Sequence, residues 1–184
     1  GAPPVWRTSF ATGTAIIAAS TNLHLEGIIF DGNRIALDVS TANITAIDCS
    51  FTANGYGMDL DDVDLEATDC RFEGNIAVGD GGSAIHADSS VLELTDCAFI
   101  DNGGNSTTGL HFGGAIRIGS GVGNGILATG CTFSGNQALV RHVQLPSAFA
   151  GSASGGAVYA GLLDQPSYFY QCSFSDNLAD SSLQ

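Results

Sequence analysis

The sequence predicts an all-β protein folded as a right-handed single-stranded parallel β-helix, a solenoid of about six coils with three short strands in each coil. Three observations support this fold class. A phenylalanine followed three residues later by an asparagine recurs six times, and all five cysteines occupy one position relative to that pair. Around each pair, apolar and polar residues alternate, which is typical of strands that bury one face.

The repeat is defined by its Phe and Asn positions. Equivalent positions in successive units are 21, 21, 27, 34 and 41 residues apart. The position two residues before each Phe holds isoleucine in the first unit and cysteine in the others. Recurrence of identical residues at one offset indicates stacked repeats, whereas a β-sandwich of short alternating strands does not require it. The pairs are Phe30/Asn33, Phe51/Asn54, Phe72/Asn75, Phe99/Asn102, Phe133/Asn136 and Phe174/Asn177, and the preceding residues are Ile28, Cys49, Cys70, Cys97, Cys131 and Cys172.

A small residue followed by an apolar one marks the start of each unit. The distance from that apolar residue to the Cys position is 12 residues in four units, then 15 and 14. From Asn to the small residue the interval grows from 3 and 3 to 9, 13 and 21 residues. Nearly all extra length therefore enters at one corner. The small-apolar pairs are Ala15-Ile16, Ala36-Leu37, Gly57-Met58, Ala84-Ile85, Ala115-Ile116 and Ala157-Val158.

Three short stretches of alternation in each unit predict its three strands. In the fourth unit they contain Ile85 and Ala87, then Leu92 and Leu94, then Cys97 and Phe99. One unit cannot bury its own inward residues, so units must stack at about 4.8 Å, giving a rod of roughly 29 Å. The domain prediction is an extended lead-in over residues 1–13, followed by a β-helix over 14–184 that is a segment of a longer solenoid.

The repeated residues have structural explanations. We expect the Phe side chains to form a buried aromatic stack, and the Asn side chains to form a hydrogen-bonded ladder at a corner. Gly81-Gly82, Gly113-Gly114 and Gly155-Gly156 suit a corner that requires positive φ. The cysteines are expected to be buried free thiols, because neighbours in one column point the same way; disulfides between them are the alternative.

These motifs resemble the repeats of the polymorphic outer membrane proteins of chlamydiae, whose signatures are F-x-x-N and G-G-A-[ILV]. They stand here as Phe133-Ser134-Gly135-Asn136, as Gly113-Gly114-Ala115-Ile116 and as Gly155-Gly156-Ala157-Val158. The resemblance covers about residues 14–179. It implies an autotransporter-like β-helix passenger that is secreted, exposed at the cell surface and active in adhesion. The absence of lysine and the acidic composition depart from the chlamydial members.

The charge balance restricts the partners. The chain carries 19 acidic residues against 5 basic ones, a net charge of −14. Nucleic acids and anionic membrane surfaces both require cations from the protein, so neither is predicted as a partner. No apolar run is long enough for a membrane helix, so we expect no direct membrane insertion by this segment. The predicted partners are a protein or glycan at a cell surface, or copies of the chain stacked end to end in a fibre or sheath.

The lengthened corner is the predicted binding face, because insertions in a solenoid emerge on one side. The segments 76–83, 103–114 and 137–156 are expected to form a ridge of loops. Apolar, aromatic and basic residues in such loops indicate contact with a partner, or packing against the outer surface of the coil. The candidate binding residues are Leu110, His111, Phe112, Arg141, His142 and Phe149.

An enzyme is the alternative, because parallel β-helices also include polysaccharide lyases and hydrolases. Asp59, His86 and Arg117 are predicted neighbours in an outward column, where they could bind or cleave an acidic sugar. No lysine is present to neutralise uronates, and the paired-Asp and Gly-His-Gly signatures of pectinase-like hydrolases are missing. We therefore predict no catalytic residue and no enzyme activity.

No cofactor is predicted, and calcium is the one metal considered. Carboxylate oxygens of Asp59, Asp61, Asp62 and Asp64 are the weak candidates for holding it. Two glycosylation sequons, at Asn43 and Asn105, matter only if the chain is secreted by a eukaryote.

Overall fold

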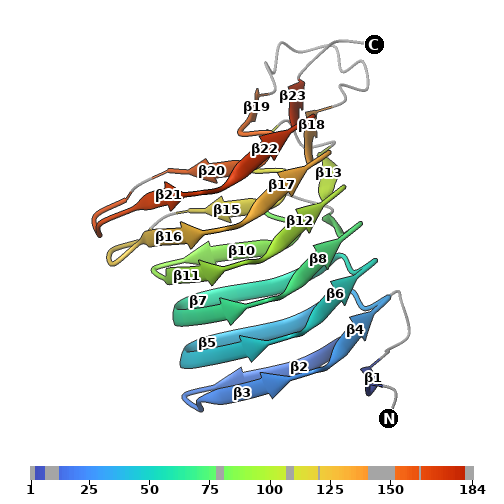
Figure 1. Cartoon of the computed structure of the whole chain (residues 1–184), viewed down its shortest axis with the longest axis vertical. Coiled ribbons are helices and arrows are strands. Elements are labelled where there is room, and N and C mark those ends of the chain that lie inside the picture. Colours follow the sequence, from blue (N-terminus) through green and yellow to red (C-terminus); the bar gives the residue numbers. More distant parts are fainter. Residues whose placement is uncertain are drawn as a thin grey trace, which may run out of the picture.

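The computed structural model describes residues 3–6, 13–77, 81–106, 110–119, 121–140, 152–161 and 163–180. These residues form strands and no helix, and every strand pair among them is parallel (Figure 1). No described segment is therefore a helix able to cross a membrane. The prediction of an all-β chain of parallel strands is confirmed, and the stacked, curled sheets are consistent with a solenoid.

The Phe motif lies in a seven-stranded sheet that contains one strand from each repeat unit. In this sheet, each Phe is paired in register with the Phe of the next unit. Val5 and Trp6 pair with Ile29 and Phe30, so the predicted lead-in contributes an edge strand to the stack. The strand order is β1 (Val5–Trp6), β4 (Ile29–Asp31), β6 (Ser50–Thr52), β8 (Arg71–Glu73), β12 (Ala98–Ile100), β17 (Thr132–Ser134) and β22 (Ser173–Ser175).

The other two predicted strands of each unit lie in one curled ten-stranded sheet. Two of its strands run through a bend at Thr41 and Asp62, whose φ angles are 52° and 58°. We call the strand segments before this bend wall 1 and those after it wall 2. The strands are β2 (Thr14–Ala19), β3 (Leu23–Glu26), β5 (Ile35–Ile47), β7 (Tyr56–Thr68), β10 (Ile85–Asp88), β11 (Val91–Thr95), β15 (Ile116–Ile118), β16 (Gly125–Thr129), β20 (Val158–Ala160) and β21 (Tyr168–Tyr170).

The lengthened corner contains ordered strands, which corrects the prediction of a ridge of loops. Insertions of successive units run alongside one another, so their backbone groups pair in parallel and need no water. We call these strands the fin; several of them project beside β17 and β22 in Figure 1. The fin comprises a four-stranded sheet of β9 (Ile76–Ala77), β13 (Gly103–Ser106), β18 (Gln137–Val140) and β23 (Leu178–Asp180), and a pair of β14 (Leu110–Phe112) with β19 (Ser152–Ser154).

The inward columns form the core. Successive Phe rings from Phe30 to Phe174 stack with centroids 4.7–5.0 Å apart and nearly parallel planes. The first five rings are fully buried, but Phe174 is 51% exposed because no described strand pairs with the outer edge of β22. Burial of that last ring was predicted, and this part of the prediction is wrong. All five cysteines are free thiols, and only Cys172 is not fully buried.

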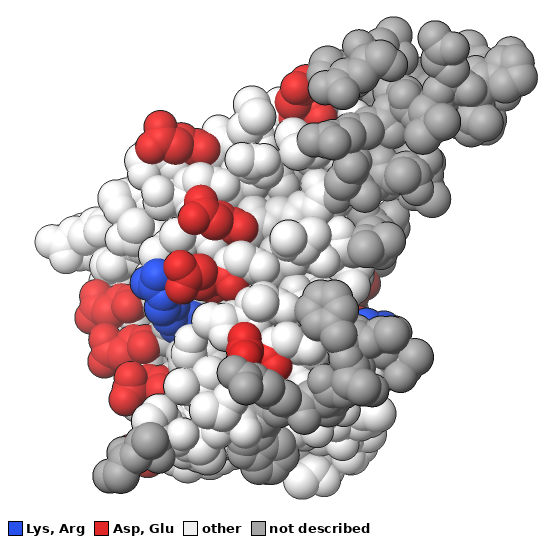
Figure 2. Space-filling model, turned by 90° about the vertical axis from the view of Figure 1, so that its right-hand side faces the viewer, with Lys and Arg blue, Asp and Glu red and all other residues white. Residues whose placement is uncertain are grey.

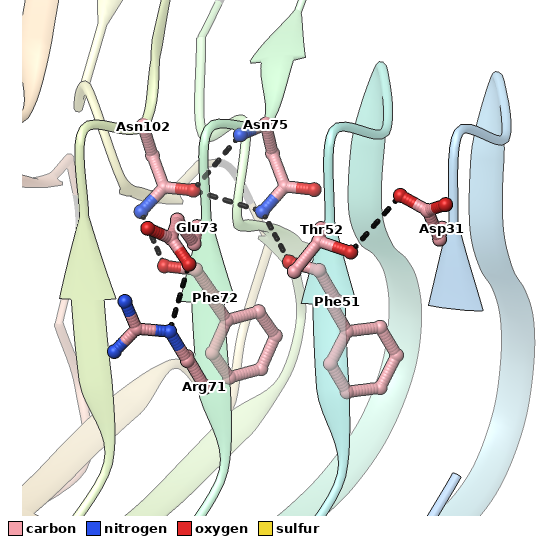
Figure 3. Close-up of polar contacts among 8 residues, drawn as sticks. All are labelled: Asp31, Phe51, Thr52, Arg71, Phe72, Glu73, Asn75 and Asn102. Carbon is pink, nitrogen blue, oxygen red and sulfur yellow. Dashed lines mark hydrogen bonds and ion pairs between the residues drawn. The ribbon is translucent and has the colours of Figure 1, made fainter. Parts of the chain in front are cut away.

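The Asn ladder runs through all six units. Each side-chain amide donates to the Oδ1 atom of the next Asn at 2.8–3.0 Å, from Asn33 to Asn177. The amide of Asn75 also donates to the carbonyl oxygen of Phe51 at 2.9 Å (Figure 3). Its Oδ1 accepts the backbone N–H of Asn54 at 3.0 Å. The ladder therefore satisfies buried polar groups of three neighbouring units at one corner.

Each ladder Asn follows a residue in the left-handed region. Gly occupies this position in three units and Ala53, Asp101 or Asp176 in the others, with φ between 51° and 69°. The Gly-Gly pairs lie at the following corner, where the chain enters wall 1. Gly113 has φ 66°, as predicted, but Gly114 is required for a different reason: a Cβ atom there would lie 2.1 Å from the carbonyl oxygen of Gly156.

Candidate functional site

The outward-facing column of wall 1 contains the charged residues that the repeat spacing predicts to be neighbours. Asp38, Asp59, His86, Arg117 and Tyr159 occupy paired positions on five successive strands. Parallel in-register pairing places these side chains on one face, while their neighbours Met58, Ile85 and Ile116 are buried. The predicted juxtaposition of Asp59, His86 and Arg117 is therefore confirmed.

His86 lies at the centre of this cluster. Its Nδ1 atom is 3.4 Å from Asp59 Oδ1, and its Nε2 atom is 3.9 Å from Asp88 Oδ2. Arg117 Nη1 contacts His86 Nε2 and lies 3.9 Å from Asp88 Oδ1. Sequence reasoning missed Asp88, although the period of two places it on the same face as His86. We call Asp59, His86, Asp88 and Arg117 the wall-1 cluster.

Aromatic rings flank the wall-1 cluster on both sides. The ring of Tyr56 lies 5.9 Å from the imidazole of His86, and Phe112 of the fin stacks on Tyr159 at 4.6 Å. Gly119 leaves room for the polar groups, because a Cβ atom there would lie 2.0 Å from Asp88 Oδ1. The cluster thus fills a polar strip between two aromatic contacts, one of which comes from the fin.

The electrostatics of the strip are dominated by carboxylates. Burial raises the pKa of Asp59; His86 and Arg34 oppose this shift, while the carboxylates of Asp38 and Asp88 add to it. The Arg117 side chain is only 17% exposed and faces Asp88. An acidic sugar would meet three carboxylates and a guanidinium already engaged within the protein, so the strip suits a neutral or cationic ligand better than a uronate.

The four aspartates proposed for calcium do not converge. Asp59 and Asp61 belong to wall 1, Asp62 forms the bend, and Asp64 belongs to wall 2. The bend sends these carboxylates onto two surfaces that face different directions. Among the described residues, no group of three or more His, Cys, Asp or Glu side chains is placed to hold a metal ion.

The candidate binding residues of the lengthened corner fall into three groups. His111 is fully buried in β14, so its prediction as a surface contact is wrong: pairing of β14 with β19 encloses it. Phe112 is half-buried against Tyr159, which matches the alternative of packing on the outer surface of wall 1. Leu110 belongs to β14, but its side chain is outside the described part of the chain, as are Arg141, His142 and Phe149 entirely.

A groove of about 640 Å³ crosses wall 2. Its acidic lining consists of Asp64, Glu66 and Glu93, and the exposed sequon residue Asn43 lies beside them. The second sequon residue, Asn105, belongs to β13, and its side chain is not described. Figure 2 shows acidic side chains spread over another face of the molecule, with few cations among them. Negative charge is thus distributed around the stack rather than confined to one patch.

We expect the substitution Asp59→Asn to change the pH dependence of stability. Because the pKa of Asp59 is raised in the folded state, its contribution to stability is greatest below its unfolded pKa of about 3.9 and falls as pH rises through the folded value. The free energy of unfolding of the variant, relative to wild type, should therefore increase from pH 4 to pH 7 in urea titrations. Asp61→Asn, at an exposed site on the same strand, controls for the removed charge; equal curves for both variants would contradict the assignment.

The fold and its recurring motifs define a class of protein, a stack of parallel strands carrying F-x-x-N and G-G-A repeats. Residues 130–161 match the family model of the Chlamydia polymorphic membrane protein repeat. The matched segment runs from β17 through β18 and β19 to β20, so the chain contains a repeat of this family, as its motifs predict. No curated protein and no solved structure was found to match the chain.

Proposed function

We propose that this chain is a right-handed parallel β-helix of six coils, one for each Phe–Asn unit, that serves at a cell surface as a structural and adhesive scaffold. The polymorphic membrane protein repeat over residues 130–161 supports the surface location. Its role is binding rather than catalysis. The partner is a protein or glycan, and no nucleic acid is bound.

The observation that supports this proposal is the concentration of nearly all the extra length at one corner. The Phe stack and the Asn ladder continue through all six units, while the described strands of the insertions pair separately in the fin. The fin begins as the two-residue β9 and reaches four residues in β13 and β18. A constant scaffold with one variable edge is the arrangement by which solenoids present binding surfaces.

Exposed apolar residues at the C-terminal end of the stack support association of copies end to end. Tyr168, Phe169, Tyr170, Phe174 and Leu178 are 41–59% exposed, and a hollow of about 410 Å³ lies between β20, β21 and β22. No described strand pairs with the outer edges of β20, β21, β22 and β23, and such edges are templates for another parallel strand. A fibre or sheath would result if the first unit of a second copy supplied that strand, whereas a further unit of the same chain would extend the solenoid.

A second candidate is binding of a neutral polysaccharide at the wall-1 cluster. Aromatic rings stack on the apolar faces of sugars, and Asp59 and Asp88 offer acceptors for their hydroxyl groups. The position of Tyr56 beside His86 is the observation that favours it. Mutation of Tyr56 to Ala should abolish such binding without affecting a partner bound at the fin.

We expect replacement of residues 137–156 by a short glycine-containing turn copied from residues 54–57 to abolish adhesion. The exchange removes β18 and β19 but leaves the Phe and Asn columns intact. Binding of purified protein to cultured cells and to immobilised glycans would be measured by surface plasmon resonance and microscopy. Arg117→Ala, which alters the wall-1 cluster alone, is the matched control. Unchanged adhesion of a folded protein that lacks β18 and β19 would exclude this part of the fin as the binding face.

A further inference from the structure

The cysteine column forms a continuous line of aligned free thiols inside the stack. Each thiol from Cys70 to Cys172 donates to a backbone carbonyl oxygen of the preceding unit at 3.4–3.5 Å, so the sulfur atoms occupy equivalent positions in successive units. Backbone N–H groups on the next strand donate to the carbonyl oxygens of Cys49, Cys70, Cys97 and Cys131 at 2.9 Å, which keeps the units in register beside the thiols. A role as a small buried apolar residue explains each cysteine on its own, but it does not explain why the five cysteines lie in one column.

The spacing of the column is too wide for a disulfide and suits a bridging metal ion. In the neighbouring column, two residues along the chain, equivalent Phe rings are 4.7–5.0 Å apart. A disulfide requires sulfur atoms about 2.05 Å apart, so column neighbours must be displaced to form one. Two metal–thiolate bonds of about 2.3 Å placed in line span about 4.6 Å, close to the separation already present.

The direction of the side chains also suits such a bridge. All the thiols point inward from the wall, roughly perpendicular to the line that joins them. A metal ion on that line would therefore meet each sulfur at roughly a right angle to its Cβ–Sγ bond, where a lone pair is available. The described residues provide no site of three or more ligands, so this geometry offers pairs of sulfur ligands only.

We propose that adjacent thiols of this column bind soft monovalent cations, Cu(I) or Ag(I), each held in a two-coordinate site between two sulfur atoms. Soft thiolate ligands select such ions. At an isolated pair, one cation replaces two thiol protons, which pass to solvent, and the site has a net charge of −1. Five cysteines contain two separate adjacent pairs, for example Cys49/Cys70 and Cys97/Cys131.

The protonation of the column favours this exchange. The flanking thiols lower the pKa of Cys70 and of Cys131, whereas the same neighbours and burial raise the pKa of Cys49 and of Cys97. The thiolate is the form that binds metals, and each adjacent pair contains one cysteine whose pKa is lowered. Cys172 is the one cysteine of the five that is not fully buried, which gives ions an entry point.

Silver titration of the folded, reduced protein tests the proposal. With silver nitrate in chloride-free buffer, native mass spectrometry should show at least two silver ions per chain that survive competition by a small monothiol. X-ray absorption should give two sulfur neighbours for each silver. Three sulfur neighbours, or silver removed completely by the monothiol, would overturn the proposal.

Two double variants that retain the same number of cysteines distinguish binding of silver between two adjacent thiols from binding of silver at any single thiol. Cys70→Ser with Cys131→Ser leaves three thiols that are not adjacent, and should lose all competition-resistant silver. Cys49→Ser with Cys172→Ser leaves Cys70, Cys97 and Cys131 adjacent, and should keep at least one ion. Equal binding by the two variants would refute the two-coordinate sites, and the matching alanine pairs replace them if either serine variant does not fold.

Discussion

The substitution Phe99→Ala is expected to lower the free energy of unfolding by about 3–5 kcal/mol. The ring is fully buried and stacks on Phe72 at 4.8 Å and on Phe133 at 4.7 Å. Its removal leaves a cavity in the middle of the column, and the parallel pairing on both sides of β12 limits how far the neighbours can close it. Urea unfolding followed by circular dichroism would measure the loss.

Phe174→Ala is the matched control, because this ring belongs to the same column and stacks on Phe133 at the same 4.7 Å. It is 51% exposed, so truncation should cost about 1 kcal/mol and create no enclosed cavity. The denaturant dependence should be unchanged in both variants, since the same surface is exposed on unfolding. Equal losses at the two positions would show that burial within the stack is not what stabilises it.

Asn75→Asp is expected to destabilise the protein by about 3–5 kcal/mol at neutral pH, although it preserves the shape of the side chain. The amide of Asn75 donates to the carbonyl oxygen of Phe51 and to Oδ1 of Asn102, and a carboxylate would face both oxygens without a proton. Burial raises the folded pKa of the introduced carboxyl above its unfolded value of about 3.9. The loss should therefore be complete at pH 7 and should diminish as pH falls through the folded pKa.

Asn43→Asp provides the comparison at an exposed position on wall 2, where the same change should alter stability by no more than about 0.5 kcal/mol. Stability would be measured by urea titration at several pH values. A small, pH-independent effect at position 75 would mean that the ladder amide is not required as a donor. The interpretation of the corner as a hydrogen-bonded ladder would then be incorrect.

Local periodicity was sufficient to predict most of the stack. The alternation around Cys97 and Phe99 identifies inward positions, and the fixed spacing of the motifs identifies which residues share a column, including Asp59, His86 and Arg117. Burial of Phe174 was mispredicted because the pattern describes an interior unit, whereas exposure depends on what lies beyond it.

The fin could not be predicted in the same way. Its segments differ in length and have no shared alternation, because their pairing depends on the register that the main stack imposes on their first residues. His111 resembles a surface histidine in the sequence but is fully buried in β14, which pairs with β19, a strand 42 residues away along the chain. The left-handed residue before Asn had a local signal in five of the six units, where it is Gly or Asp, and the F-x-x-N motif leaves this position unspecified.

The parallel pairing also determines how the molecule responds to a pulling force. The hydrogen bonds between units run along the stack, so tension applied to its two ends loads the junctions between units in series and separates the weakest one first. Junctions between the early units contain the Phe sheet and the two walls, whereas those joined through β9, β13, β18 and β23 contain an additional ladder. The walls change in the opposite direction, because β5 and β7 pair at eleven positions whereas β15 with β20 and β16 with β21 pair at three each. The lengthened corner therefore compensates for the shorter walls, and resistance to extension should be similar along the stack.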